Sequence, residues 1–169
     1  IQVEELHDWN CCGATSYASI DEMQSFSLAA RNLAIAEKQQ NNGDVPHVIA
    51  PCNACYLVLT KTQKYMDTYP HVKNKVDKAL DAAGMHYDGR TKVRHPLDVI
   101  VHDVGLKTVS EKIVKNLKGL RVACYYGCQV VRPFAEFDDQ HNPMTMDKLV
   151  TALGGESVDW PLKTFCCGG

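Results

Sequence analysis

Residues 45–55 read VPHVIAPCNAC, a short β-branched run that is bounded by prolines and followed at once by two cysteines. The run at 45–50 has the composition of a buried strand. The segment that follows it, at 53–67, predicts a helix. We therefore expect a strand that leads into a helix, with Cys52 and Cys55 at the junction.

Helical periodicity recurs on both sides of this unit. Residues 19–40 carry apolar side chains at helical spacing, and an Asn-Asn-Gly sequence at 41–43 ends the pattern. Short strands are expected to begin at Leu120 and to span 157–160. Strands that alternate with helices predict an α/β fold with short, mostly parallel sheets flanked by helices. The other expected segments are a helix at 71–83 that ends at Gly84, a polar loop at 86–95, a helix or a strand at 97–103, a helix at 110–117 and a helix at 144–153.

Two cysteine patterns occur twice in the chain. VIAPCNAC at 48–55 and VACYYGC at 122–128 both read as a strand followed by cysteines. DWNCCG at 8–13 and DWPLKTFCCGG at 159–169 both place Asp-Trp shortly before Cys-Cys-Gly. A repeat of this kind indicates an internal duplication. We therefore expect two related half-domains, at 1–105 and 106–169.

Composition narrows the class of protein. The chain has 169 residues, of which 45% are hydrophobic, so it can form a core without disulfides. A net charge of -2 gives no reason to expect nucleic acid or an anionic membrane as a partner. No segment approaches the roughly 20 apolar residues of a membrane span, and residues 1–10 lack the pattern of a secretory signal. We expect a soluble, cytoplasmic protein, and a chain that starts at Ile1 and stops after a cysteine pair is expected to be a fragment.

Eight cysteines in a reducing cytosol are more typical of metal ligands or redox groups than of four structural disulfides, which are the alternative. Cys11 and Cys12 are followed after a long spacer by Cys52 and Cys55, and a C-x-x-C at a strand end can direct both thiols at one metal centre. Adjacent cysteines are poorly placed to bridge each other and awkward for tetrahedral zinc. A polynuclear iron–sulfur centre can bind diverging thiols through different metal atoms, so the spacing favours it over zinc.

The order Cys-Cys-Gly, spacer, C-x-x-C, YYGCQVVRP at 125–133 and Cys-Cys-Gly-Gly resembles the CCG-domain repeat of HdrB, the disulfide-cleaving component of heterodisulfide reductase. In that family a complete motif has one leading cysteine, a CCG pair and a trailing C-x-x-C. The resemblance covers essentially the whole chain, which holds the internal portion of the two-motif pattern, and the first spacer is slightly long. The first motif, without its leading cysteine, matches Cys11, Cys12, Cys52 and Cys55, and the second, without its trailing C-x-x-C, matches Cys128, Cys166 and Cys167.

The resemblance implies that these seven cysteines are ligands and act in catalysis through two noncubane 4Fe-4S clusters, each held by five cysteines in the family. It implies that the clusters split a small-molecule disulfide, such as the coenzyme M–coenzyme B heterodisulfide of methanogenesis, with electrons that arrive singly. It also implies two partners from the same reductase complex, the flavin-containing HdrA and the iron–sulfur protein HdrC. The alternatives are a CCG-type electron-transfer module of an organic-acid oxidoreductase and a structural zinc module.

Thiol release needs protons, and several side chains near the cysteines are candidates for supplying them. These are His7, Lys163 and the pair Tyr125-Tyr126, although each residue type is also typical of a surface or packing role. Arg132 is a candidate for holding an anionic substrate group, with a surface role as the alternative. We expect Cys124 to fill the core, Trp9 and Trp160 to occupy equivalent core positions, and Asp138 and Asp139 to be solvated.

Overall fold

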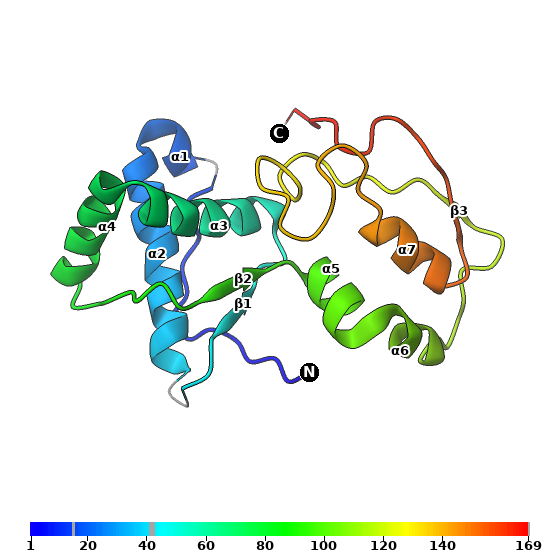
Figure 1. Cartoon of the computed structure of the whole chain (residues 1–169), viewed down its shortest axis with the longest axis horizontal. Helices are drawn as coiled ribbons and strands as arrows, with labels where there is room; N and C mark the ends of the chain where they lie inside the picture. Colours follow the sequence, from blue (N-terminus) through cyan, green and yellow to red (C-terminus); the bar gives the residue numbers. More distant parts are fainter. Residues whose placement is uncertain (15, 41–42, 169) are drawn as a thin grey trace. The chain divides into compact units, whose positions relative to one another are not determined.

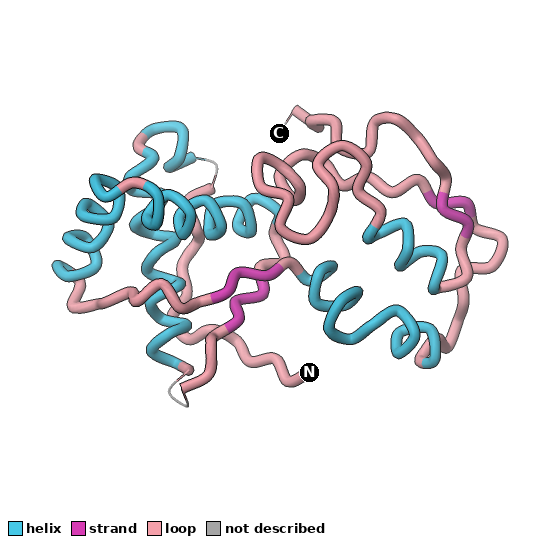
Figure 2. The backbone as a smooth tube through the Cα atoms, viewed as in Figure 1, coloured by secondary structure: helices cyan, strands magenta, loops and turns pink. Residues whose placement is uncertain are grey.

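The chain forms an α/β structure, as the sequence predicted, with a small parallel sheet in each of two packing units (Figures 1 and 2). A computed structural model describes residues 1–14, 16–40 and 43–168. The units are Ile1–Arg94 and His95–Gly169. They are defined by packing, whereas the predicted half-domains at 1–105 and 106–169 are defined by cysteine motifs, so the half-domains stay a prediction.

The periodic stretch at 19–40 is helical, as the sequence indicated, but it is divided between helices α1 (Ser16–Ile20) and α2 (Glu22–Gln39). The reason lies at Asp21, which has an extended backbone with φ -150 and ψ 105. Its carboxylate accepts a hydrogen bond from the backbone N–H of Met23 at 2.9 Å. This N-cap starts α2 anew. Part of the predicted stop at 41–43 lies outside the described residues.

The core of the N-terminal unit lies between α2 and two further helices, α3 (Asn53–Thr68) and α4 (Pro70–Ala82). Both helices lie where the sequence predicted them, and Gly84 follows α4 with a φ of 67. The apolar stripe of α2 packs into this core because its residues recur at helical spacing. The most deeply buried apolar residues here are Phe26, Ala29, Ala30, Leu33 and Val76.

The predicted strand at 45–50 is confirmed as β1 (His47–Ile49), which pairs in parallel with β2 (Lys92–Arg94). The prediction of a polar loop at 86–95 is therefore wrong over its last part. Two features outside that segment explain the strand. β1 supplies the pairing partner, and the buried carboxylate of Glu37 on α2 fixes the backbone of residues 88–91, which lead into β2. That carboxylate accepts hydrogen bonds from the backbone N–H groups of Asp88, Arg90 and Thr91 at 2.7, 2.5 and 3.0 Å.

In the C-terminal unit, the segment at 97–103 is helical and not a strand. It comprises α5 (Pro96–Asp98) and most of the π-helix η1 (Val99–Gly105), and α6 (Leu106–Glu111) continues the run. The helix predicted at 110–117 is wrong, because the backbone N–H of Leu117 donates to the carbonyl of Leu153 at 2.9 Å and not to the preceding turn. The helix predicted at 144–153 is confirmed as α7 (Thr145–Ala152).

The second sheet pairs β3 (Arg121–Val122) with β4 (Glu156–Ser157) in parallel. The strand expected from Leu120 is therefore present but short. The one expected at 157–160 starts a residue earlier and ends sooner. No helix in the described part of the chain is long and apolar enough to cross a bilayer.

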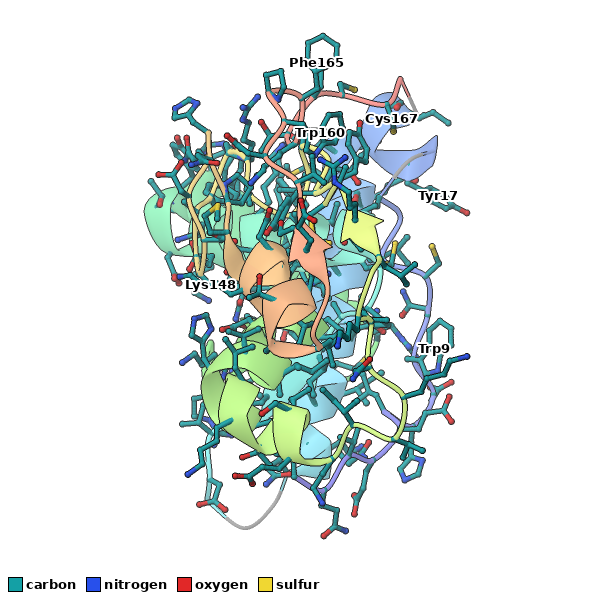
Figure 3. All side chains as sticks on the ribbon, turned by 90° about the vertical axis from the view of Figure 1, so that its right-hand side faces the viewer. Trp9, Tyr17, Lys148, Trp160, Phe165 and Cys167 are labelled. Carbon is teal, nitrogen blue, oxygen red and sulfur yellow. The ribbon has the colours of Figure 1, made fainter. Side chains whose placement is uncertain are left out.

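The two tryptophans do not occupy equivalent core positions, so that prediction is wrong. Trp9 is 59% exposed and lies at the surface in Figure 3, where its indole N–H donates to Glu5. Trp160 is half-buried, and its indole N–H donates to the backbone carbonyl of Cys124 at 2.9 Å. Cys124 itself is buried in the core, as expected.

His95 gives the C-terminal unit a pH-dependent element. Its Nδ1 accepts the backbone N–H of Leu97 at 3.2 Å and caps α5. Burial lowers the pKa of His95, although the charge of Asp98 opposes the shift. Below the unfolded pKa of about 6.5, the unfolded chain therefore binds more protons than the folded chain, so stability is lost as the pH falls.

We expect His95→Asn, which keeps an acceptor at the N-cap without titrating, to reduce this loss of stability. Urea unfolding of both proteins at about pH 7 and about pH 5.5 measures it. If the urea midpoint fell by the same amount between the two pH values in His95→Asn and in the unaltered protein, His95 would not be the source of the pH dependence.

Candidate metal centres

Cys12 meets Cys55 near the start of α3, and with Cys11 and Cys52 these residues form what we call the first centre. Cys52 is the N-cap of α3, and Cys55 lies in its first turn. Cys12 is 2% exposed, and its Sγ lies 2.9 Å from the Sγ of Cys55, although 43 positions separate the two residues. Cys11 and Cys52 both lie close enough for their charge to act on Cys12. The fold therefore brings together thiols from two distant segments.

The thiols of the first centre differ in how readily they ionise. Burial raises the pKa of Cys12, and the hydrogen bond with Cys55 offsets only part of that effect. Burial also raises the pKa of Cys55, and its hydrogen bond with Cys12 and the neighbouring charges add to the rise. The backbone N–H of Cys55 lowers the pKa of Cys52, with burial opposing and the N–H of Ala54 adding to it. A bound cation favours the thiolate form at all of these positions.

The donor set of the first centre fits a thiolate-bound metal. It offers thiols alone, and thiolates are the ligands that iron–sulfur clusters and zinc accept. Each of the eight cysteines, all of them in the described part of the chain, is free. Among the described residues, no three or more His, Cys, Asp or Glu side chains are arranged to hold a metal ion. The fit therefore rests on the donor chemistry and on the contact between Cys12 and Cys55, and the other thiols would have to turn toward the metal.

Side chains of α2 hold the segment that carries the first cysteine pair. The buried Asn32 donates from Nδ2 to the backbone carbonyl of Asn10 at 2.7 Å, and its Oδ1 accepts the backbone N–H of Asn10 at 3.0 Å. The hydroxyl of Ser25 donates to the carbonyl of Cys12 at 3.4 Å. The backbone is thus fixed to α2 on both sides of Cys11, which positions Cys12 over the start of α3.

Gly13, directly after the first pair, needs the conformational freedom of glycine. Its φ is 73, and a Cβ would lie 3.3 Å from both Leu28 Cδ1 and Tyr17 Cβ. We expect Gly13→Ala to lower the free energy of unfolding by about 2–4 kcal/mol, from left-handed backbone strain together with overpacking. Gly89→Ala is the matched control, because Gly89 has a φ of 82 and nothing within 4 Å of the added carbon. Urea unfolding measures both variants, and equal losses would show that the contacts at Gly13 cost nothing.

Cys128, Cys166 and Cys167, which we call the second centre, all lie close enough to Tyr125 in the C-terminal unit for their charges to act on it. Loss of hydration raises the pKa of Tyr125, and the charges of all three thiols raise it further. The hydroxyl donates to the backbone carbonyl of Phe165 at 2.6 Å, which ties together the segments that precede the two cysteine groups. Cys166 and Cys167 are exposed, and Figure 3 shows Cys167 near Phe165 at the surface.

Three candidates from the sequence have structural partners in place of the roles we suggested for them. Lys163 is buried, and its Nζ lies 3.0 Å from Asp147 Oδ1 and 3.3 Å from the thioether sulfur of Met144, so it is bonded within the core. Tyr126 is buried as well, and its hydroxyl donates to Asp147 Oδ2 at 2.7 Å. Arg132 donates to the hydroxyl of Thr164 at 2.7 Å, so its guanidinium is used within the fold.

In the acidic pair before α7, Asp139 is exposed and Asp138 is half-buried, which agrees with the prediction that they are solvated, and both carboxylates also accept backbone N–H groups. Asp138 accepts the N–H groups of two residues at the start of α7. Asp139 accepts those of Asn142 and His141, and these bonds lower the pKa of Asp139. His7 is exposed, and its role as a proton donor stays a prediction.

Sequence reasoning missed Asn32 and Asp147, the buried polar residues that hold the cysteine segments. Each lies in an amphipathic helix, where a single polar residue is usually interpreted as facing solvent. Nothing in the local sequence marked either residue as buried, because a polar residue in a helix reads the same whichever way it faces.

Comparisons with known proteins identify the family of the chain. The model of the CCG family, described as a cysteine-rich domain, matches residues 1–60 and 122–169. The 8-methylmenaquinol:fumarate reductase membrane anchor subunit of Wolinella succinogenes is 32% identical, over 99% of this chain and 57% of its own length. A protein of Archaeoglobus profundus that is named as similar to the HdrB component of heterodisulfide reductase is also 32% identical, over 99% and 56%.

The HdrB component of the ferredoxin:CoB-CoM heterodisulfide reductase of Methanosarcina mazei is 30% identical, over 97% of this chain and 54% of its own length. The chain thus spans about half the length of the curated relatives it matches. The family model covers most of the chain, and its two matched segments contain both cysteine centres. The chain therefore belongs to the CCG family of cysteine-rich domains.

Proposed function

We propose that this chain is the cysteine-rich catalytic module of an iron–sulfur oxidoreductase that reduces a small-molecule disulfide to two thiols. The observation that carries the proposal is the 2.9 Å contact between the Sγ atoms of Cys12 and Cys55, with Cys11 and Cys52 beside them. The grouping of Cys128 with the second pair around Tyr125 supports a second centre of the same kind.

The ligands would be Cys11, Cys12, Cys52 and Cys55 in the first centre, and Cys128, Cys166 and Cys167 in the second. The cofactors we propose are two noncubane 4Fe-4S clusters, with zinc as the alternative. When bound, an iron–sulfur cluster supplies electrons one at a time together with iron that has an affinity for sulfur. Zinc has no redox chemistry, so it fits only a structural role.

The protein's own residues keep the two centres accessible. Cys11 and Cys52 are exposed in the first centre, as are Cys166 and Cys167 in the second. A substrate in solution can therefore approach thiol-bearing segments in each unit. In the overall reaction, one disulfide takes up two electrons and two protons and is reduced to two thiols. The protons can come from water, because the buried Lys163 and Tyr126 are both bonded to Asp147.

The electrons would come from other proteins of a complex, because the chain has no nucleotide-binding motif. By analogy with the HdrB-type relatives from Archaeoglobus and Methanosarcina, we propose the flavin-containing HdrA and the iron–sulfur protein HdrC as partners, in a cytoplasmic complex. We propose the coenzyme M–coenzyme B heterodisulfide as the first substrate to test.

A second candidate is an electron-transfer module of an organic-acid oxidoreductase. The observation that favours it is the 32% identity to the Wolinella succinogenes protein. The name of that protein refers to a menaquinol and to fumarate but not to a disulfide. In that role the same cysteines would hold clusters that pass electrons without cleaving a substrate.

Anaerobically prepared protein, given reduced methyl viologen and the heterodisulfide, separates the two candidates. The proposal predicts two thiols released per disulfide at a rate that depends on protein concentration, and no release from Cys55→Ser. Oxidation of pre-reduced protein by fumarate-coupled partner proteins, with no thiol released from the heterodisulfide, would instead support electron transfer alone.

A further inference from the structure

A buried polar cluster lies in the C-terminal unit at the residues that lead into the second centre. At its middle is Asp147 of α7, with 2% of its side chain exposed, paired with Lys163 at 3%. Asp147 Oδ1 lies 3.0 Å from Lys163 Nζ and accepts the hydroxyl of Ser157 at 2.6 Å. Asp147 Oδ2 accepts the hydroxyl of Tyr126 at 2.7 Å. One carboxylate thus contacts three segments that are distant in sequence.

Two of these segments lead directly into the second centre. Tyr126 stands two positions before Cys128, and Lys163 stands three positions before Cys166. The segments are also joined to each other, because the carbonyl of Lys163 accepts the backbone N–H groups of Tyr126 and Gly127 at 2.8 and 3.1 Å. The side-chain cluster and this backbone contact therefore fix the same pair of segments from two directions.

The Tyr126 hydroxyl has a second function in the cluster. It accepts the backbone N–H groups of Met146 and Asp147 at 2.7 and 3.1 Å while it donates to Asp147 Oδ2. These two N–H groups belong to the first turn of α7, where they have no partner within the helix. The cysteine-bearing segment is thus joined to the start of a rigid helix through groups that the helix leaves free.

We propose that Asp147 is the positioning residue of the second centre. It touches none of the three thiols in the contacts described, and it acts by holding Tyr126 and Lys163, which set the separation of Cys128 from Cys166 and Cys167. The inference rests on the proposed function, because it takes these three cysteines to be metal ligands. Groups that orient metal ligands in this indirect way are commonly worth about 10–100-fold in metal affinity.

The test is Co²⁺ titration of the metal-free protein under anaerobic conditions, read by the thiolate-to-cobalt charge-transfer absorption. We expect Asp147→Asn to weaken Co²⁺ binding at the second centre by about 10–100-fold and to leave the first centre unchanged. Double variants assign the signal to a centre. In a Cys128→Ser background, Asp147→Asn should cause no further loss of Co²⁺ binding, because the second centre is already disrupted. In a Cys12→Ser background, the loss caused by Asp147→Asn should add to the loss caused by Cys12→Ser, because Cys12 lies in the other unit. Glu156→Gln, which removes an exposed ion pair with Arg121 in the same unit, is the matched control and should bind Co²⁺ as the unaltered protein does.

Asp147→Asn leaves the buried Lys163 with only the exposed carboxylate of Asp159, at 3.9 Å, as a counter-charge, and it can unfold the unit for that reason alone. The double variant Asp147→Leu/Lys163→Met therefore replaces the pair with apolar groups of similar volume, and circular dichroism checks its fold. Weakened binding at the second centre in this folded variant supports the inference. Unaltered affinity in either folded variant, or equal weakening at both centres, would overturn it. If Cys128→Ser itself leaves the cobalt signal unchanged, the second centre of the proposed function is wrong and the inference fails with it.

Discussion

Cys12→Ser should remove the metal of the first centre and lower the iron content of the protein by about half, since the second centre lies in the other packing unit. The reason is the position of Cys12. Its Sγ is buried and lies 2.9 Å from the Sγ of Cys55, so no other thiol of the described chain can take its place without moving the backbone. A serine hydroxyl stays protonated at neutral pH, whereas thiolate is the form that binds metal.

The measurement is the iron and acid-labile sulfide content per chain after anaerobic purification, with the visible spectrum of each variant. Cys124→Ser is the matched control. Cys124 is as buried as Cys12, at 2% exposure, but its thiol lies outside both motifs. Cys124→Ser should lower the free energy of unfolding and leave the iron content unchanged. The same iron content in Cys12→Ser as in Cys124→Ser would contradict the assignment of the first centre.

Glu37→Ala should have the largest effect on folding, with a loss of about 3–5 kcal/mol in the free energy of unfolding. Its carboxylate accepts three backbone N–H groups at the approach to β2, and alanine leaves those donors without a partner. Because β2 is the pairing partner of β1, the strand that leads into Cys52 should lose order with it.

Glu37→Gln separates the hydrogen bonds from the side chain's packing. The amide keeps one acceptor oxygen and the same length, so we expect about half of the loss seen with alanine. Urea unfolding followed by circular dichroism measures both variants. If Glu37→Ala lowered the free energy of unfolding by less than about 1 kcal/mol, water would have to satisfy these N–H groups as well as the carboxylate does, and the assignment would be wrong.

Local signals were sufficient to predict the segments that carry the first centre. A β-branched run between prolines predicted β1, and the helix that follows begins at Asn53 as expected. Composition and spacing also predicted thiolate ligands, because adjacent cysteines and a C-x-x-C have few other uses in a reducing compartment, and that assignment stays a prediction. The sequence pattern therefore predicted the family correctly.

The features that the sequence did not predict depend on contacts between distant residues. β2 exists because Glu37 and β1 supply hydrogen bonds from elsewhere in the chain. The burial of Lys163 depends on Asp147, which stands 16 positions away on another element. Charged residues are usually expected at the surface, so a pattern-based analysis cannot recognise a buried pair before the fold is known. The exposure of Trp9 has a different origin: the repeated Asp-Trp pattern suggested that the two tryptophans are equivalent, whereas the indole of Trp9 donates to the nearby Glu5 at the surface.

The central claim is that thiols from separate segments converge to hold iron–sulfur centres, and metal analysis tests it most directly. Iron, zinc and acid-labile sulfide are measured on the same anaerobically purified sample. The account predicts iron with a comparable amount of sulfide, both lowered by Cys12→Ser. About one zinc per chain with no sulfide would contradict it and would identify the cysteines as a structural zinc site.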